Sequence, residues 1–254
     1  MMLGATIPLS KFTLKCVVSM MEQEKQKLIA IVVAAGVGSR MKSASPKQYL
    51  MIEGKTMLEH SVEAMLSDSR IQKLIVVISP ADLLGQQMKF EDRRVEVARV
   101  GGATRALSVK NGIAYSGADF YDWVLIHDAA RPCLQPEHLS HLIDTCLEHN
   151  KGGILAVPVN DTLKLANCDL EIKKTVSREN LWRAQTPQMF RVGELSSALE
   201  MAGSAVTDEA SALEFIGTHP LLIEGTATNL KVTRPEDLWL AQAILSRKNR
   251  KENS

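Results

Sequence analysis

The strongest constraint on the fold is a series of short apolar runs separated by segments that suit helices. Most of these runs are continuous and rich in β-branched residues, and they end at glycine, proline, serine or a charged residue, as buried strands do. Strands that alternate with helices and are apolar throughout form a mostly parallel sheet covered on both faces. The predicted strands are Ile31–Val33, Leu74–Ile78, Val95–Val100, Trp123–His127, Gly152–Pro158 and Leu221–Glu224.

The helices predicted between these strands complete a single α/β domain over residues 27–246. Pro136 and Pro235 stand where proline is favoured, at the first position of a helix. Residues 1–26 are expected to be a flexible extension, and residues 247–254 a charged tail that frays from the last helix. A short strand and turn is predicted over Leu50–Gly54. Thr56 could cap a helix that runs to Leu66. The other predicted helices are Asp82–Phe90, Arg105–Tyr115, Pro136–Glu148, Val192–Gly203, Asp208–Ile216 and Pro235–Ser246.

The segment 159–176 breaks this alternation. It holds two short strand-like pieces, DTLKL and EIKKTV, around a polar turn at Asn167–Asp169. This pattern predicts a β-hairpin. Its alternating polar faces give it little to bury against its own chain, so we expect it to pack against another body. A second subunit is the simplest candidate.

The overall charge and the cysteines limit the class of protein. The formal net charge is only +1, which gives no reason to expect a nucleic-acid surface or an anionic membrane as partner. The apolar stretch in residues 3–20 is interrupted by Lys11 and Lys15 and is too short to cross a bilayer. The four cysteines are widely spaced, which favours reduced thiols in a cytoplasmic protein over disulfides or a zinc site.

A glycine-rich turn follows the first strand. Ala34, Ala35, Gly36 and Gly38 leave the backbone open to a ligand, and two cations, Arg40 and Lys47, come next. Backbone N–H groups and nearby cations together suit a phosphate. Three features exclude the common phosphate motifs: the third glycine of a dinucleotide fingerprint is Met41, no acid ends the second strand, and no Walker A lysine follows. A tight turn with no ligand stays an alternative.

Two further loops follow strands directly, at Gly101-Gly102 and at Asp128–Arg131. Ligands of open parallel sheets bind beyond the carboxyl ends of the strands, which is where these loops and the glycine turn should meet. Asp128 suits a metal, a ribose or a substrate hydroxyl, and it could equally cap a turn. Arg131 suits a phosphate or carboxylate. Lys231 lies in a similar loop, although a lone lysine is more often solvated.

Several motifs in order along the chain resemble those of the 2-C-methyl-D-erythritol 4-phosphate cytidylyltransferases. The resemblance covers Leu28 to Ala243. The motifs are AAGVGSRM…PKQY, GGATRALSV, HDAARP, PVNDTLK, LWRAQTPQ, TDEASALE and NLKVTRPEDL. The resemblance implies a three-layer, Rossmann-like nucleotide-diphospho-sugar transferase fold with a protruding β-hairpin arm. It also implies transfer of CMP from CTP to the phosphate of methylerythritol phosphate in the non-mevalonate isoprenoid pathway, with magnesium bound mainly by the CTP phosphates.

The resemblance also implies roles for residues. Arg40 and Lys47 would stabilise the transition state, while Arg178 and Lys231 would hold the acceptor phosphate. The hairpin would clasp a second subunit and bring Thr162 and Arg178 to the neighbour's site, which makes a homodimer the expected unit. The residues implied to bind CTP are Ala34, Ala35, Gly36, Gly38, Gly101, Gly102 and Ser108, and those implied to face methylerythritol are Asp128, Arg131 and Thr186.

One departure and two alternatives stay open. Relatives often carry acidic residues where this chain has Ala103-Thr104 and Leu107, which leaves selectivity for CTP over UTP open. The acceptor could be another polyol phosphate, such as ribitol 5-phosphate. The chain could also be a catalytically silent nucleotide-binding protein, although such a binder needs no set of transition-state cations.

Overall fold

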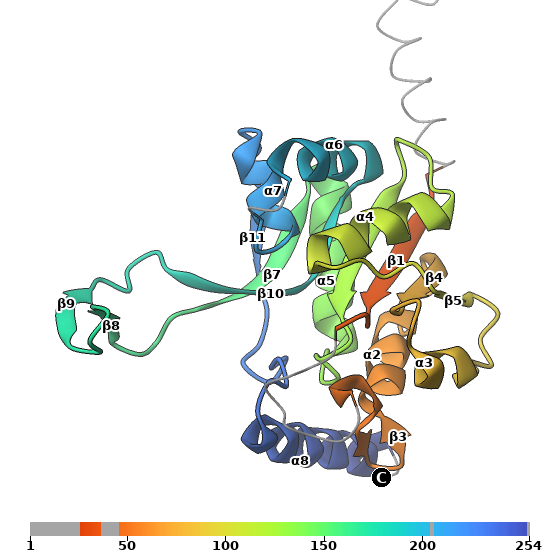
Figure 1. Ribbon diagram of the computed structural model, residues 1–254, viewed down its shortest axis with the longest axis horizontal. Coiled ribbons are helices and arrows are strands. Elements are labelled where there is room, and N and C mark those ends of the chain that lie inside the picture. The colour runs from red at the N-terminus through yellow and green to blue at the C-terminus, as the bar shows by residue number, and fades with distance from the viewer. Residues whose placement is uncertain (1–25, 37–45, 204–205, 253–254) are drawn as a thin grey trace, which may run out of the picture.

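The computed structural model describes residues 26–36, 46–203 and 206–252. These residues form a seven-stranded sheet with the strand order β11-β7-β10-β6-β1-β4-β5 (Figure 1). Its strands are β1 (Leu28–Val33), β4 (Ile71–Val77), β5 (Val95–Ala98), β6 (Trp123–Asp128), β7 (Gly153–Pro158), β10 (Trp182–Arg191) and β11 (Leu221–Glu224). Every strand predicted for the sheet is present, with ends that differ by a few residues.

The sheet is mostly parallel, as predicted. β1 pairs in parallel with both β4 and β6, β4 with β5, and β7 with β11. The exception is β10, which runs antiparallel between β6 and β7. The parallel strands β1, β4, β5 and β6 therefore end at one edge of the sheet, where the loops with special residues begin.

The antiparallel strand β10 is missing from the sequence prediction. Its sequence contains Pro187, which argues against a central strand because proline cannot donate to the ladder. The structure accommodates it at an irregularity. Pairing with β7 stops at Ala184 and resumes at Gln188, and pairing with β6 begins at Gln188, so the proline lies outside the paired stretches.

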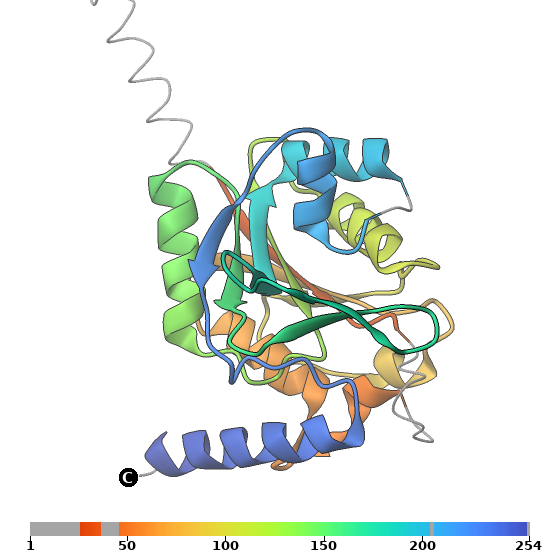
Figure 2. The same cartoon turned by 90° about the vertical axis from the view of Figure 1, so that its left-hand side faces the viewer.

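Helices cover both faces of the sheet (Figure 2). One face carries α2 (Met57–Leu66) and α5 (Pro136–Glu148), and the other carries α4 (Arg105–Ser116), α6 (Val192–Ala202) and α7 (Glu209–Phe215). Within β1, Ala30 and Val32 pack in the core under α2 and α5, while Ile31 packs in the core under α4 and α6. Because both faces are buried, the strands need apolar side chains at every position.

A third, smaller core joins α8 (Pro235–Glu252) to the tight hairpin β2 (Met51–Ile52) and β3 (Lys55–Thr56). Glu53 and Gly54 form its turn with φ values of 47° and 83°. This matches the predicted strand and turn. α8 runs past its predicted end at Ser246 because the charged residues that follow are good helix formers and none is glycine or proline.

Helix α3 (Leu83–Gln87) is shorter than predicted. Asp82 caps it rather than belonging to it, because its carboxylate accepts a hydrogen bond from Gly85 N at 3.0 Å. The chain leaves the helix at Met88, and Phe90 then packs against the core on the α2 side. In the described part of the chain, no helix is both long enough and apolar enough to span a membrane.

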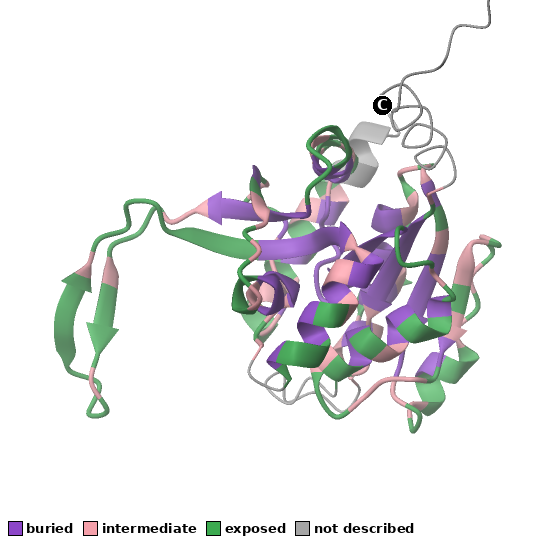
Figure 3. Cartoon of the chain, turned by 90° about the horizontal axis from the view of Figure 1, so that it is seen from above, coloured by how far each residue is buried: buried purple, intermediate pink, exposed green. Residues whose placement is uncertain are grey.

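The predicted hairpin is present as β8 (Leu163–Ala166) and β9 (Ile172–Val176), an antiparallel pair separate from the main sheet. It projects from the body as an arm joined by the segments after β7 and before β10 (Figure 1). Its surface is almost entirely exposed (Figure 3), and Leu170 and Ile172 are 87% and 67% accessible. The arm therefore has no core of its own.

Candidate active site

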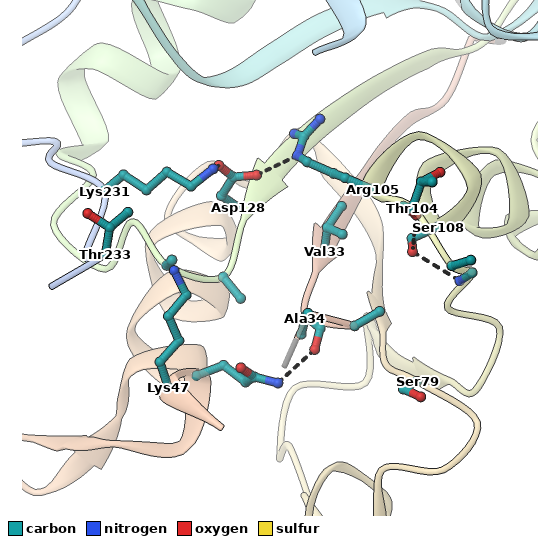
Figure 4. A pocket seen from close by; sticks show the side chains of 17 residues that line it. Val33, Ala34, Lys47, Ser79, Thr104, Arg105, Ser108, Asp128, Lys231 and Thr233 are labelled. Carbon is teal, nitrogen blue, oxygen red and sulfur yellow. Dashed lines mark hydrogen bonds and ion pairs between the residues drawn. The ribbon is translucent and has the colours of Figure 1, made fainter. Parts of the chain in front are cut away.

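A cavity of about 540 Å³ lies beyond the carboxyl ends of β1, β4 and β6, where the sequence predicts ligand binding (Figure 4). It is lined by residues from the loops after these strands, from the loop after β5 and the first turn of α4, from the 3-10 helix η2 (Lys47–Tyr49) and from the segment before α8. Those residues are Val33, Ala34, Ala35, Gly36, Lys47, Gln48, Ser79, Gly102, Ala103, Thr104, Arg105, Ser108, Asp128, Ala129, Ala130, Lys231 and Thr233. Eight of them belong to the predicted site: Ala34, Ala35, Gly36, Lys47, Gly102, Ser108, Asp128 and Lys231.

Two hydrogen bonds fix the short helix η2 beside the start of the glycine turn. Gln48 is buried and its Nε2 donates to the carbonyl of Ala34 at 2.9 Å. The Tyr49 hydroxyl donates to Asp82 Oδ2 at 2.6 Å. Burial and the neighbouring carboxylate raise the pKa of Tyr49, so the hydroxyl keeps its proton. These bonds hold η2 against Ala34, at the start of the glycine turn, and against Asp82, in the loop after β4. Gly38 and Arg40 lie outside the described residues.

Lys47 reaches across the cavity to the opposite loop. Its Nζ donates to the main-chain carbonyl of Val232 at 2.7 Å. Lys231 precedes that carbonyl in sequence, and its own amino group also faces the cavity (Figure 4). The two predicted lysines therefore line one cavity, although they come from opposite ends of the domain.

The Gly101-Gly102 loop is held by close backbone packing. A Cβ at Gly101 would lie 2.5 Å from Ala35 Cβ and 2.8 Å from the Ile78 carbonyl oxygen, so only glycine fits. Gly102 N donates to Ser108 Oγ at 3.0 Å, and the Ser108 hydroxyl donates to the Thr104 carbonyl at 2.9 Å. Gly102 and Ser108 line the cavity, whereas Gly101 brings its loop against the glycine turn.

Asp128 ends β6 and holds a cation on each carboxylate oxygen. Arg105 Nε donates to Oδ1 at 2.8 Å, and Lys231 Nζ lies 2.7 Å from Oδ2. Asp128 is only 6% exposed. Burial alone would raise the pKa of its carboxyl, but Arg105 and Lys231 outweigh that effect and hold the pKa well below its usual range. Asp128 is therefore a carboxylate at neutral pH.

Sequence reasoning missed Arg105 and its second partner, Glu209. Arg105 Nη1 donates to Glu209 Oε1 at 2.6 Å. The available indication for Arg105 was a cation within a few residues of glycines that follow a strand, as it was for Arg40. Glu209 had none, because it is far from Arg105 in sequence and meets it only in the fold.

Thr186 contacts the backbone of Asp128 and is not among the residues that line the cavity. Its Oγ1 accepts from Asp128 N at 3.0 Å and lies 3.0 Å from His127 Nδ1. His127 Nε2 faces the carbonyl of Arg131, which can only accept, so Nδ1 takes the threonine proton. Burial lowers the pKa of His127 to about 4, so the ring is neutral. The Thr186 hydroxyl therefore both accepts and donates a hydrogen bond within the protein.

Arg131 is also directed at the protein interior. It is 8% exposed, and its guanidinium donates to the carbonyl of Asn229 at 2.7 Å and to that of Ala184 at 3.4 Å. These contacts tie the loop after β6 to β10 and to the segment before α8. Thr162 and Arg178 lie on the two segments that join the arm to the sheet, and neither lines this cavity.

The cavity suits an anionic ligand. Among the described residues that line it, Lys47, Arg105 and Lys231 are cationic and only Asp128 is anionic. No group of three histidine, cysteine, aspartate or glutamate side chains that could hold a metal occurs among the described residues. Both oxygens of Asp128 are paired with cations. These residues fit a divalent cation that is carried by the phosphates of a ligand rather than by protein carboxylates.

The sequence matches one protein family over nearly the whole described domain. The family model for 2-C-methyl-D-erythritol 4-phosphate cytidylyltransferase matches residues 28–247. The enzyme of that name from Vibrio parahaemolyticus is 49% identical over 231 residues, covering 89% of this chain and 99% of the relative. The one from Laribacter hongkongensis is 50% identical over 225 residues, covering 88% and 98%.

Solved structures agree with these matches. A crystal structure of 4-diphosphocytidyl-2C-methyl-D-erythritol synthase superposes with a TM-score of 0.77 at 42% identity, covering 87% of this chain and 99% of that one. The Francisella tularensis 2-C-methyl-D-erythritol 4-phosphate cytidylyltransferase gives 0.75 at 33% identity, covering 86% and 100%. The likeness confirms the predicted three-layer transferase fold. This chain belongs to the 2-C-methyl-D-erythritol 4-phosphate cytidylyltransferase family.

Proposed function

We propose that the protein transfers CMP from CTP to 2-C-methyl-D-erythritol 4-phosphate in the non-mevalonate pathway to isoprenoid precursors. The products are 4-diphosphocytidyl-2-C-methyl-D-erythritol and pyrophosphate. One observation carries the proposal beyond family membership: Lys47 and Lys231 line one cavity beside a glycine turn at the strand ends. This arrangement suits two phosphate-bearing ligands that must meet.

The proposed reaction is an in-line displacement at phosphorus. A phosphate oxygen of the acceptor bonds to the α-phosphorus of CTP, while the bond from that phosphorus to the bridging oxygen of the β-phosphate breaks. The electron pair leaves with pyrophosphate. Because the acceptor phosphate is already an anion, the step needs no general base. The barrier lies in bringing two anions together and in the growing charge on the leaving group, which cations and fixed dipoles lower.

The nucleotide side of the site consists of the glycine turn, the Gly102 loop and Lys47. Ala35 and Gly36 would present backbone N–H groups to the triphosphate, whereas the N–H of Ala34 donates to the Val77 carbonyl at 2.8 Å. A Cβ at Gly36 would meet none of the described residues within 4 Å, which leaves room for a ligand. Gly102 and Ser108 would lie against the cytidine, with Gly101 setting their loop. Lys47, together with Arg40, would neutralise charge on the α-phosphate and the leaving pyrophosphate.

The acceptor side consists of Lys231 and Asp128. Lys231 would hold the acceptor phosphate, while Asp128 orients that lysine and faces the polyol. Arg131 and Thr186 would act on the acceptor through Asp128, because their polar atoms contact the protein around it. This refines the expectation that both would face methylerythritol directly.

Magnesium would enter with CTP. Bound through the phosphates of CTP, it would reduce their negative charge, and the protein residues that hold those phosphates would be those of the glycine turn and Lys47. Magnesium keeps several waters and commonly binds through substrate phosphates, which fits a cavity whose described lining has one carboxylate, already paired.

The arm supports a homodimer as the working unit. Its exposed leucine and isoleucine side chains have no core within the described chain, and a second copy would cover them. Arg178 and Thr162, at the base of the arm, would then reach the partner's cavity. We further propose residues 27–246 as one catalytic domain with its arm at about 159–176, acting in the cytoplasm.

The direct test combines the purified protein with magnesium, one nucleotide and one polyol phosphate, and records both pyrophosphate release and product mass. We expect turnover with CTP and 2-C-methyl-D-erythritol 4-phosphate, and little with UTP or with ribitol 5-phosphate. Preference for ribitol 5-phosphate would overturn the acceptor assignment. If CTP binds but releases no pyrophosphate with any acceptor, the assignment of catalysis is overturned.

A further inference from the structure

Arg105 connects two buried carboxylates from distant parts of the chain. Its Nε donates to Asp128 and its Nη1 donates to Glu209, at 2.8 Å and 2.6 Å. Glu209 is 1% exposed. A buried carboxylate needs a charged partner, and the planar guanidinium can serve two of them in fixed directions, which the single ammonium of lysine cannot do.

The connection continues to the cavity through Asp128. One oxygen of Asp128 faces Arg105 and the other faces Lys231. We call Glu209, Arg105, Asp128 and Lys231 the charge chain. Figure 4 shows its last three members in a row along one side of the cavity. Glu209 is not among the residues that line the cavity, so any influence of Glu209 on a ligand must pass through the others.

Glu209 is rigidly anchored. It is the first residue of α7, whose cap, Asp208, accepts from Ser211 N at 3.0 Å. Gln188 of the central strand β10 ties this cap to the sheet: its Nε2 donates to Asp208 Oδ2 at 2.9 Å, and its Oε1 accepts from Ala210 N at 3.1 Å. The charge chain therefore begins at a fixed point of the fold.

We propose that Glu209 and Arg105 are positioning residues for the acceptor: they orient the Asp128 carboxylate and, through it, the Lys231 ammonium. The proposal rests on the proposed function for the assignment of Lys231 to the acceptor phosphate. By holding Nη1, Glu209 fixes the orientation of the Arg105 guanidinium, in which Nε contacts Oδ1, the buried Nη2 has no hydrogen-bond partner among the described residues, and Oδ2 is left to Lys231. A guanidinium released from Glu209 would be able to turn, so that Nε and Nη2 contact both oxygens of Asp128 in the bidentate arrangement that these groups favour.

The test is the nearly isosteric variant Glu209→Gln, with Arg105→Lys as a second variant. In both we expect a roughly tenfold higher KM for the acceptor, while the KM for CTP changes less than about twofold. In a Lys231→Met background, Glu209→Gln should change acceptor binding less than about twofold, since the group it positions is gone. Where turnover is too slow to measure a KM, calorimetric titration gives the Kd of the acceptor.

Glu59→Gln is the matched control. Glu59 also holds a structural role, accepting from Thr56 N at 2.6 Å at the start of α2, but it is not among the residues that line the cavity. It should lower thermal stability without changing either KM. If Glu209→Gln behaves in the same way, with only stability reduced, the proposal is wrong.

A crystal structure of Glu209→Gln gives a result that does not depend on activity. We expect Arg105 to contact both Asp128 oxygens and Lys231 Nζ to move away from Oδ2. An unchanged contact between Lys231 and Asp128 would overturn the positioning role even if the wild-type protein used a different acceptor. Absence of wild-type turnover with CTP and the acceptor would instead count against the proposed function.

Discussion

Lys47 and Val232 are joined by a hydrogen bond of 2.7 Å from the lysine amino group to the main-chain carbonyl, which adjoins Lys231. The bond spans 185 residues of sequence. It connects the nucleotide side of the proposed site to its acceptor side before any ligand is present. Lys47 is thus anchored to the loop that carries Lys231. The distance between these two lysines is therefore set by the fold rather than by the ligands.

Replacing Lys47 by alanine should remove a preorganised charge from the transition state. We expect kcat to fall roughly a hundred- to a thousandfold, corresponding to about 3 kcal/mol. Stopped-flow or steady-state measurement of pyrophosphate release gives this value. The control is Lys55→Ala, which removes an exposed lysine that pairs with Glu63 on the surface. A kcat for Lys47→Ala within a few-fold of wild type would remove Lys47 from the mechanism.

Asp128 should contribute a definite pH dependence to stability. Its pKa is lowered in the folded protein relative to the unfolded value of about 3.9. For a lowered acid pKa, the stabilisation is complete above the unfolded value and is lost as the pH falls toward the folded one. Below pH ~4 the wild-type free energy of unfolding should therefore lose up to about 1.4 kcal/mol per pH unit from this group alone.

Urea unfolding of wild type and Asp128→Asn between pH 3 and pH 6 isolates that contribution. The difference in unfolding free energy between the two proteins should be constant at the upper end and should shrink below pH ~4. Asp169→Asn, at the exposed turn of the arm, serves as the control. A difference that stays constant to pH 3 would show that Asp128 is not held as a carboxylate by Arg105 and Lys231.

The parallel strands and the place of the site follow from local pattern. Runs such as Leu74–Ile78 are apolar at every position, and only a sheet covered on both faces buries all of them. Once the sheet is parallel, the loops at Gly36, Gly102 and Asp128 must meet at one edge. The structure confirms this in the residues that line the cavity.

Two features do not follow from local pattern. Pro187 prevents β10 from being predicted as a strand. The strand accommodates this proline at a break in its pairing, and that break exists only when β6 and β7 are both in place. The partnership of Arg105 with Glu209 spans 104 residues and joins helices on one face of the sheet. No spacing rule connects such residues, since helix and strand periodicities relate only near neighbours.

The glycines of the site should separate stability from binding. In Gly101→Ala the new methyl would meet a backbone carbonyl and Ala35, neither of which can rotate away, so we expect a loss of about 1–3 kcal/mol in unfolding free energy. In Gly36→Ala the methyl meets none of the described residues, so stability should stay within about 0.5 kcal/mol while the KM for CTP rises. Equal destabilisation of both variants would contradict the packing, and an unchanged KM in Gly36→Ala would place the triphosphate elsewhere.

The arm should supply residues to the partner's site. If Arg178 acts on the neighbouring cavity while Lys47 acts on its own, each site combines the body of one subunit with the arm of the other. Lys47→Ala and Arg178→Ala dimers should each be nearly inactive. A mixed dimer has one site with both defects and one with neither. Random exchange of subunits in equal amounts should therefore restore about a quarter of the wild-type activity.

The control for this mixing experiment pairs Lys47→Ala with Lys231→Ala. Both residues line the cavity of their own subunit, so every site in a mixed dimer keeps one defect and activity should not return. Sedimentation velocity run alongside establishes that the mixed species has formed. If activity returns in both mixtures, its return does not depend on which subunit supplies Arg178. Restoration in neither, with dimers present, would mean that Arg178 serves its own subunit.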